Sequence, residues 1–205
     1  MKATAPLVFG FVLLLAFLLL LASFRSIVIA AKAVVLNLLS VGAAYGVVIA
    51  IFQWGWGENL LNFKSNGGIA SWLPIFMFVI LFGLSMDYHV FILSRIREAY
   101  DRGLSTEDAV AHGIKTTAGT VSSAALVMVG AFGIFATLPF LDFKEMGIGL
   151  AAAVLIDATI VRGVLLPATM KLLGDWNWYL PSWLTWLPRI EHAAEPAAKP
   201  VPVTA

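Results

Sequence analysis

The sequence predicts an all-α polytopic membrane protein, a bundle of five transmembrane helices. Hydrophobic residues make up 60% of the 205-residue chain and charged residues only 12%, against about 25% charged residues in ordinary soluble domains. The mean hydropathy is +0.92. Five segments also reach the roughly 20 apolar residues that a helix needs to cross a bilayer.

The apolar segments follow one another along most of the chain. The first is free of charge, and the last encloses two charged residues, Asp157 and Arg162. The predicted spans cover residues 6–24, 34–54, 72–93, 117–137 and 146–170. We expect residues 1–188 to form one transmembrane domain. Residues 189–205 are rich in alanine, proline and charge, a composition typical of a disordered tail.

The connection between the third and fourth spans carries local signals for a turn and a helix start. Gly103 suits the left-handed conformation that often ends a helix. Ser105, three residues before Asp108, fits a capping box. The pattern therefore predicts that the third helix ends near Gly103 and that a short cytoplasmic helix leads into the fourth span.

Positive charge is unevenly divided between the two sides of the predicted bundle. Nine lysine and arginine residues fall on one side, and the other side has only Lys2, Lys64 and Lys144. Cytoplasmic loops carry the excess of positive charge. We therefore expect the C-terminus and the loops at 25–33 and 95–115 in the cytoplasm and the N-terminus outside, in an inner or plasma membrane. An outside N-terminus predicts that the chain is the tail of a larger protein.

Several functions are excluded by what the sequence lacks. The chain has no cysteine, which rules out disulfides and thiolate metal sites. Its histidines, His89, His112 and His192, are scattered and form no metal-ligand cluster. No phosphate loop or nucleophile–base arrangement is visible, and the net charge of +1 comes without a basic stripe. We expect no enzyme activity, no metal or cofactor site and no nucleic-acid partner. The only coupling ion that we expect is the proton.

The most informative residue is Asp87, a carboxylic acid set in an apolar run. A helix that enters the bilayer at Trp72 places it about 22 Å deep, within a hydrocarbon core of about 30 Å. Ionisable groups at such depth are costly and usually mark an ion or proton path. We interpret Asp87 as a proton carrier, since an apolar environment favours the neutral acid. The alternative is a structural aspartate that accepts hydrogen bonds from hydroxyl groups of other helices.

The two residues after Asp87 point in other directions. Tyr88 lies about 100° around the helix from Asp87, so we expect it to reach a carboxylate on another helix or simply to pack there. His89 lies about 200° around. Histidine titrates near neutral pH and is able to extend a proton relay, but the favoured interpretation of His89 is a polar residue that faces lipid or a neighbouring helix.

Other polar residues lie inside the predicted spans. Asp157 and Arg162 are five residues and about 140° apart on an α-helix, so we expect no direct stacking but a structural charge network, formed through another helix or a bent side chain. Arg162 alternatively snorkels to the cytoplasm, and Asp157 is the second candidate for proton coupling. Ser122 and Ser123 are small residues that let helices approach and hydrogen-bond across them, and Asn37 is expected to join helices in the same way.

The polar residues and their neighbours resemble a family signature. The run Gly-Leu-Ser-Met-Asp-Tyr at 83–88, continued by residues 90–98, is similar to a motif of the MMPL (mycobacterial membrane protein large) branch of the resistance–nodulation–division (RND) transporters. Further similar stretches cover most of the chain outside the tail, including residues 37–40, 43–46, 52–56, 147–151, 157–162 and 177–181.

The resemblance implies the last five of twelve spans, the second half of an RND-type membrane domain. It implies a transporter that couples inward proton flow to export of lipids or other hydrophobic compounds. Asp87 and Tyr88 would be one of two Asp–Tyr pairs that meet across pseudo-symmetric halves, and Asp157 with Arg162 would tune the electrostatics. In this motif position 89 is commonly acidic, whereas this chain has His89.

The resemblance also implies missing parts. The other Asp–Tyr pair, seven spans and the porter domains are absent from this chain, so we expect it to transport only with an N-terminal half or with a second copy. The alternative is a truncated or remnant fragment that acts as a non-transporting membrane interaction module.

Overall fold

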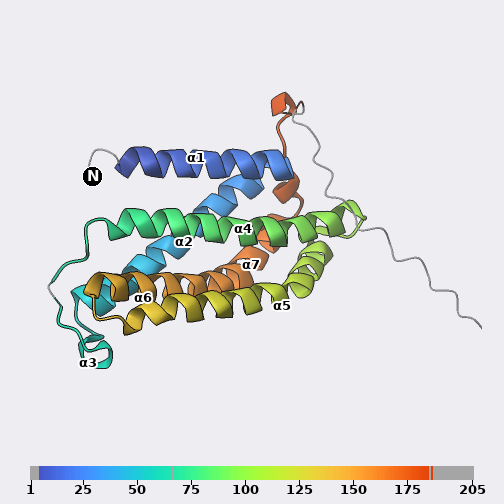
Figure 1. The fold of residues 1–205 in the computed structure, drawn as a ribbon. Helices are drawn as coiled ribbons and strands as arrows, with labels where there is room; N and C mark the ends of the chain where they lie inside the picture. Colours follow the sequence, from blue (N-terminus) through green and yellow to red (C-terminus); the bar gives the residue numbers. More distant parts are fainter. Residues whose placement is uncertain (1–4, 66, 185, 187–205) are drawn as a thin grey trace, which may run out of the picture.

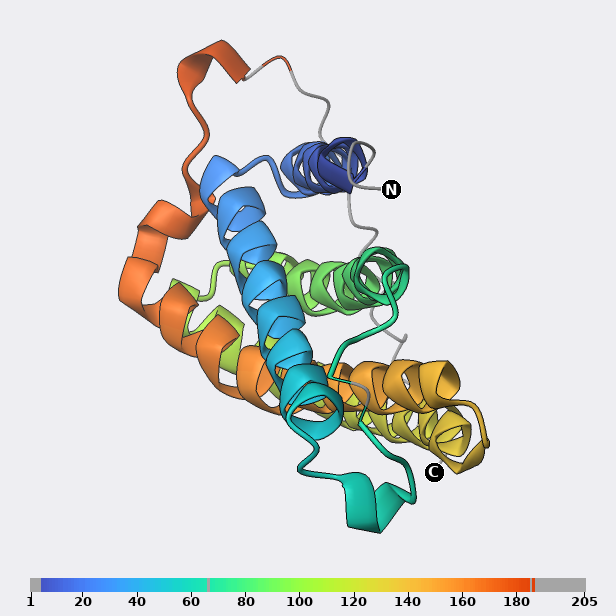
Figure 2. The same cartoon turned by 90° about the vertical axis from the view of Figure 1, so that its left-hand side faces the viewer.

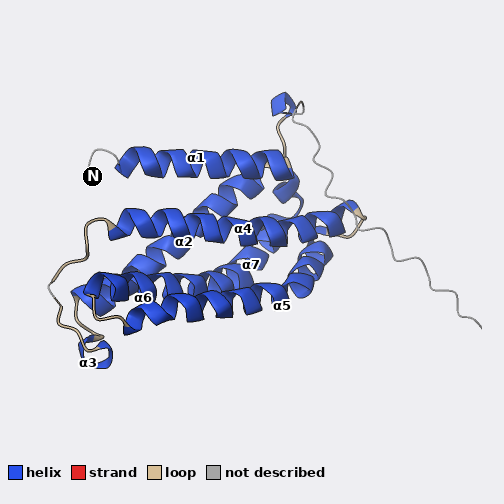
Figure 3. Cartoon of the chain, viewed as in Figure 1, coloured by secondary structure: helices blue, strands red, loops and turns tan. Residues whose placement is uncertain are grey.

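The computed structural model describes residues 5–65, 67–184 and 186, and the regular structure among them is all helical (Figure 3). Five helical stretches are long and apolar enough to cross a membrane: Ala5–Phe24, Ile27–Gln53, Leu73–Asp101, Thr106–Thr137 and Leu141–Trp178. The predicted five-helix, all-α class is confirmed. Each predicted span falls on one of these stretches, and the last three stretches run well beyond their predicted spans. The proposed tail at 189–205 lies outside the described residues.

Several of the long stretches combine α-helix with π-helical or 3-10 turns. In chain order the elements are α1 (Ala5–Phe24), α2 (Ile27–Val48), η1 (Ile49–Gln53), α3 (Glu58–Leu61), α4 (Leu73–Asp101), α5 (Thr106–Gly133), η2 (Ile134–Thr137), α6 (Leu141–Ile156), η3 (Asp157–Leu165), α7 (Leu166–Leu173), η4 (Gly174–Trp178) and η5 (Ser182–Leu184).

The long helices pack around α4. In both views α1, α4 and α6 run roughly parallel, and α2 crosses this row obliquely (Figures 1 and 2). Large side chains fill the space between them, and the bulkiest fully buried ones are Phe24, Phe52, Phe78 and Phe82. Helix α5 packs along α4 and α6 but is the least covered of the five stretches. Among the described residues, one long side of α5 is therefore left uncovered.

A tight turn joins α1 to α2 and is tied to the C-terminal end of the chain. Arg25 adopts a positive φ of 50°. The Ser26 hydroxyl caps α2 by accepting a hydrogen bond from the Ile29 backbone N–H at 3.1 Å, and it donates one to the Asn177 carbonyl at 2.5 Å. A capping hydroxyl of this kind typically contributes about 1 kcal/mol.

At the opposite end of the bundle, the connection from α2 to α4 is held against the start of α6. Lys144 donates from Nζ to the Leu61 carbonyl at 2.5 Å, and Glu145 Oε2 accepts a hydrogen bond from the Ala70 backbone N–H at 3.2 Å. Both charged side chains are buried. Their hydrogen bonds to backbone groups offset the cost of removing the charges from water.

The turn between α4 and α5 follows the sequence signals. Helix α4 ends at Asp101, Gly103 has a φ of 96°, and the Ser105 hydroxyl accepts a hydrogen bond from the Asp108 backbone N–H at 3.1 Å. The predicted end and the predicted cap are confirmed. The helix that leads into the fourth span does begin after the cap, at Thr106, but it is not a short element, because α5 continues from there without a break into the span.

Helices α4 and α5 approach each other closely at Gly113. A β-carbon at this position would lie 2.4 Å from Ile96 Cγ1 and 2.9 Å from the Ile96 backbone nitrogen. Because backbone atoms of α4 cannot move aside as a side-chain end can, only glycine fits here. Gly113 thus sets the distance between the two helices.

We predict that Gly113→Ala destabilises the protein by about 1–3 kcal/mol, the usual range for overpacking. The midpoint of thermal unfolding in detergent micelles measures the effect. The matched control is Gly119→Ala on the same helix, where a β-carbon meets nothing within 4 Å. It should not lower the midpoint, because glycine is the poorer helix former by about 0.5–1 kcal/mol. Equal midpoints for the two variants would contradict the close approach.

Candidate functional site

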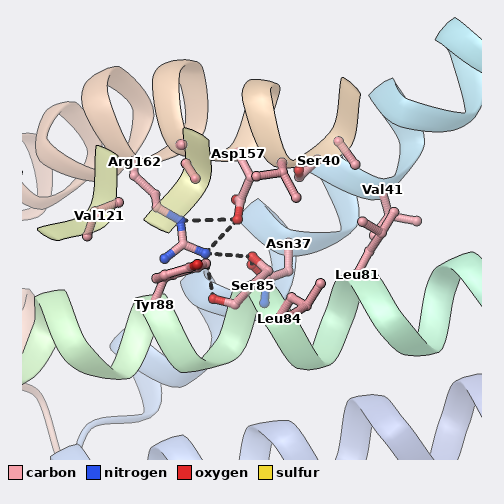
Figure 4. A pocket seen from close by; sticks show the side chains of 14 residues that line it. Asn37, Ser40, Val41, Leu81, Leu84, Ser85, Tyr88, Val121, Asp157 and Arg162 are labelled. Atoms are coloured by element: carbon pink, nitrogen blue, oxygen red, sulfur yellow. Dashed lines mark hydrogen bonds and ion pairs between the residues drawn. The ribbon is translucent and has the colours of Figure 1, made fainter. Parts of the chain in front are cut away.

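A buried ion pair lies in the middle of the fifth stretch. Arg162 reaches back to Asp157, with Nη2 at 2.5 Å and Nε at 3.1 Å from Oδ2 (Figure 4). Arg162 is 3% exposed and Asp157 7%. Since an unpaired charge at such a position is strongly unfavourable, the two side chains depend on each other.

The direct pairing corrects the prediction that these two residues do not stack. Residues 157–165 form a π-helix, in which hydrogen bonds join residue i to residue i+5. Residues five apart therefore come close to one face, whereas an α-helix separates them by about 140°. Pro167, which lacks an N–H group, follows directly in the first turn of α7, and a wider turn before a proline relieves its clash with the preceding backbone.

Arg162 also joins three helices to one another. Its Nη2 donates to the Ser85 carbonyl at 2.6 Å and to the Ser85 hydroxyl at 3.0 Å on α4. The Ser85 hydroxyl in turn donates to Asn37 Oδ1 on α2 at 2.5 Å. The alternative that Arg162 snorkels to the cytoplasm is therefore wrong, and the expected interhelical role of Asn37 is confirmed.

Tyr88 lies at the edge of this network. The Arg162 guanidinium carbon is 4.7 Å from the centre of the Tyr88 ring, a cation–π contact. The Tyr88 hydroxyl donates to the Met128 sulfur on α5 at 3.4 Å, and a thioether is a weak acceptor. The Tyr88 hydroxyl can thus exchange the Met128 sulfur for a stronger acceptor at little cost in free energy.

A small cavity of about 20 Å³ opens beside the ion pair. Its polar lining comes from Asn37, Ser40, Ser85, Tyr88, Asp157 and Arg162, which Figure 4 shows converging from α2, α4 and η3. Three buried atoms of these residues have no hydrogen-bond partner among the described residues: Asn37 Nδ2, Asp157 Oδ1 and Arg162 Nη1. A cavity of this size has room for one water molecule.

Asp87 lies apart from this cluster. It is exposed on α4 and does not line the cavity. Gly83, Val90 and Phe91 are exposed on the same helix at spacings of three and four residues, which places them on one face with Asp87. The helix therefore presents its carboxylate outward, away from the other helices of this chain.

The remaining predicted site residues also divide into buried and exposed ones. His89 is 0% exposed, so of its two favoured interpretations the lipid-facing one is wrong, and the side chain faces neighbouring helices in the bundle interior. Ser122 and Ser123 are exposed on α5, and the Ser123 hydroxyl donates to the Thr120 carbonyl of its own helix at 3.0 Å. Ser123 therefore does not bond across helices in this chain.

Sequence reasoning missed a second polar cluster, where the chain turns from α1 to α2. Lys32 Nζ donates to Asn177 Oδ1 at 2.9 Å, and Asn177 Nδ2 donates to the Met170 and Gly174 carbonyls at 2.7 and 2.6 Å. A lysine six residues into an apolar helix was the available signal. Sequence reasoning also missed Ser85, which is buried on the inner face of α4.

Within the described ranges, no three His, Asp or Glu side chains are grouped so that they could hold a metal ion.

Comparison with known proteins adds a family match. The sequence profile of the MMPL family matches residues 4–201. The chain is 48% identical over 183 residues to the "Mycolic acid-containing lipids exporter MmpL11" of Mycolicibacterium smegmatis, which covers 89% of this chain and 19% of the relative. Identity and coverage are the same for the "Heme uptake protein MmpL11" of Mycobacterium tuberculosis. The "Trehalose monomycolate exporter MmpL3" of M. smegmatis is 38% identical over 162 residues, 79% of this chain and 16% of that protein.

We predict that Asp157→Asn destabilises the protein by about 3–5 kcal/mol, because it leaves the Arg162 charge buried without its partner. Thermal unfolding in detergent micelles measures the loss. Asp142→Asn, at an exposed position of α6, is the matched control and should leave the midpoint nearly unchanged.

The double variant Asp157→Leu/Arg162→Met tests the same pair from the other side. It removes both charges and should recover much of the stability that Asp157→Asn loses. A double variant as unstable as the single one would show that the ion pair is not the source of the effect.

Proposed function

The chain belongs to the MMPL family, and from this premise we propose that it is one membrane half of a proton-driven exporter of lipids or other hydrophobic compounds. It spans about a fifth of the length of the curated relatives it matches. One relative named above is called an exporter of mycolic acid-containing lipids and another an exporter of trehalose monomycolate, which supports an apolar cargo. The proposed half works together with an N-terminal half or with a second copy.

The outward position of Asp87 is the observation that carries this proposal. A carboxylate that faces lipid near the centre of a bilayer costs several kcal/mol. Asp87 nevertheless stands on a face that no other helix covers within the part of the chain that the structure describes, whereas Asp157 and Arg162 are enclosed. A further protein surface that packs on this face of α4 removes the carboxylate from lipid.

Asp87 fits the role of proton carrier at such an interface. In general a low-dielectric setting favours the neutral form of a carboxyl group, and hydrogen bonds and positive charge favour its ionised form. Tyr88 follows Asp87 directly in the chain, and its ring contacts the Arg162 guanidinium, which pairs with Asp157. The proton load on Asp87 is thereby linked to the buried ion pair, which we assign to electrostatic tuning.

Tyr88 is the proposed hydrogen-bond partner for a carboxylate of the other half. Its present acceptor is the Met128 sulfur, and a carboxylate oxygen forms a far stronger hydrogen bond. The cation–π contact with Arg162 keeps the ring at the boundary between the interior and the outer face. Exchange of acceptors at the Tyr88 hydroxyl would couple docking of the other half to the network in this one.

The orientation follows from charge. The end of the bundle that holds the α4–α5 turn carries the ion pairs Arg95–Glu98, Arg97–Asp101 and Lys171–Glu107. The excess of lysine and arginine at this end supports a cytoplasmic location. The N-terminus of α1 then lies outside, in a multi-pass protein of the cell membrane.

We predict that Asp87→Asn abolishes proton-dependent export by the assembled transporter, because asparagine resembles the neutral acid but cannot release a proton. Export driven by an imposed pH gradient in proteoliposomes is the measurement. Asp101→Asn on the same helix is the matched control. Asp101 forms an exposed pair with Arg97 at 3.0 Å, and such pairs contribute only about 0–1 kcal/mol, so export should stay at the unmodified level.

Two outcomes would contradict the proposal in different ways. Proton-dependent export that survives Asp87→Asn would remove Asp87 from the carrier role. An unmodified assembly that binds its partner but exports nothing would favour the alternative, a non-transporting membrane interaction module.

A further inference from the structure

The segment that follows α7 has two different faces. Asn177 is fully buried, and Leu184 belongs to the same buried core cluster as Phe24. The other face is exposed and carries aromatic rings, those of Trp176, Tyr179, Trp183 and Trp186. No charged residue occurs from position 176 to position 186. One face of this aromatic segment, residues 176–186, is therefore held by the bundle, and the other presents uncharged rings to the surroundings.

The chain leaves the axis of α7 at Gly174. This residue has a φ of 51°, a conformation that favours glycine, and it ends the helix. Asn177 Nδ2 donates to the Met170 and Gly174 carbonyls at 2.7 and 2.6 Å, so carbonyl groups at the end of the helix keep hydrogen-bond partners. The direction of the aromatic segment is therefore fixed at its start.

The inner face ties the segment to both turns at this end of the bundle. The Asn177 carbonyl accepts a hydrogen bond from Ser26 in the α1–α2 turn at 2.5 Å. The Trp178 ring stacks on Tyr100 with 4.4 Å between the ring centres, and its Nε1 donates to the Thr106 hydroxyl at 3.2 Å. These contacts hold the segment at the level where α1 and α4 end and where α2 and α5 begin.

The aromatic face continues an exposed aliphatic stripe on the fifth stretch. From the end of α6 through η3 and α7, exposed apolar side chains recur at spacings of four and five residues: Leu155, Ile160, Val164, Ala168 and Leu172. Trp176 follows Leu172 by a further four residues. In a membrane span, an exposed aliphatic stripe faces hydrocarbon, and aromatic rings are enriched where a span reaches the headgroups. The change from aliphatic to aromatic side chains along one side therefore marks the passage out of the hydrocarbon.

The seven tryptophans of the chain lie at the two ends of the bundle. Three of them flank the α2–α4 connection and are exposed, and the other four belong to the aromatic segment. Tryptophan combines a large apolar ring with an N–H group that needs a polar partner, which suits it to both interfaces of a bilayer.

The separation of the two ends fits a bilayer. Trp72 stands at the start of α4, and Tyr100, which contacts Trp178, stands near its end. The two positions are about 42 Å apart along the helix, at about 1.5 Å per residue. A bilayer with its headgroup regions is about 40–45 Å thick. The aromatic segment thus lies at headgroup depth when Trp72 lies in the opposite headgroup region.

We propose that residues 176–186 lie in the headgroup region of the bilayer with their aromatic face toward phospholipid, and that they anchor the α1–α2 and α4–α5 turns at the membrane surface. A lipid interface accounts together for the missing charge, the continuity with the aliphatic stripe and the spacing of the two tryptophan groups. In the proposed orientation the interface is that of the cytoplasmic leaflet. The anchoring itself requires neither export nor a proton path.

Depth-dependent fluorescence quenching tests this placement. The chain has no native cysteine, so a bimane dye attached to Tyr179→Cys reports on the exposed face alone. The protein is reconstituted into vesicles of phosphatidylcholine and phosphatidylglycerol that carry a nitroxide either near the headgroup or near the end of the acyl chain. We expect the headgroup nitroxide to quench the dye more strongly than the chain-end nitroxide, by about twofold or more, because interfacial rings sit at the headgroup level.

Two further labelled positions calibrate the depth. A dye at Leu155→Cys, which is exposed within the fifth stretch, should be quenched more strongly by the chain-end nitroxide. A dye at Lys64→Cys, which is exposed in the connection between α3 and α4, should respond chiefly to iodide in the water.

Removal of two rings tests their part in the anchoring. In Trp183→Ser/Trp186→Ser, the dye at Tyr179→Cys should lose its headgroup quenching and become accessible to iodide, since these rings no longer hold the segment in the interface. The matched control is Trp54→Ser/Trp56→Ser at the other end of the bundle, which should leave the dye at Tyr179→Cys unchanged. Unfolding midpoints report whether each variant is intact.

Several results would overturn the proposal. Iodide quenching at Tyr179→Cys equal to that at Lys64→Cys would place the segment in water, and stronger chain-end quenching would place it in hydrocarbon. Protection from lipid nitroxides and iodide alike would show that a protein surface, such as a second copy of this chain, covers the aromatic face. Unchanged quenching in a folded Trp183→Ser/Trp186→Ser variant would remove the rings from the anchoring role. None of these results bears on the assignment of Asp87 as proton carrier.

Discussion

The architecture depends on one buried guanidinium. Arg162 forms the ion pair with Asp157, binds Ser85 on α4 and, through Ser85, reaches Asn37 on α2. A cation in the interior of a membrane bundle persists only if its hydrogen bonds are nearly complete. Three helices must therefore keep a fixed register around it. The π-helical turn at 157–165 is the local distortion that makes the geometry available, and π-helical turns of this kind are frequent at functional sites.

The same network divides the consecutive polar residues of α4 between two environments. Ser85 and His89, one turn apart, are buried and face inward, Asp87 faces outward, and Tyr88 lies at the boundary. In the proposed function this division has a purpose, because one helix face is complete within the chain and the other requires a second protein surface. An outward carboxylate is then the feature of a half-site.

The sequence was sufficient for the fold because length and hydropathy decide it, and the turn at Gly103 and the cap at Ser105 depend only on local chemistry. It was not sufficient for the site. The angle between Asp157 and Arg162 followed from α-helical periodicity, which a π-helix changes. The environments of Asp87 and His89 depend on how α4 is rotated against its neighbours, and the 100° step between residues fixes only their relative directions. Pro167 and an arginine that needs partners were the available signs of the distortion.

Contact between the Asp87 face and another part of the transporter is the central claim, and site-directed photo-crosslinking tests it most directly. Gly83 is exposed one turn from Asp87, a β-carbon there meets nothing within 4 Å, and the chain has no native cysteine. A photoreactive group attached to Gly83→Cys in the assembled transporter in native membranes should couple to a transmembrane segment outside residues 1–205 or to a second copy of this chain. Coupling to lipid alone would contradict the claim.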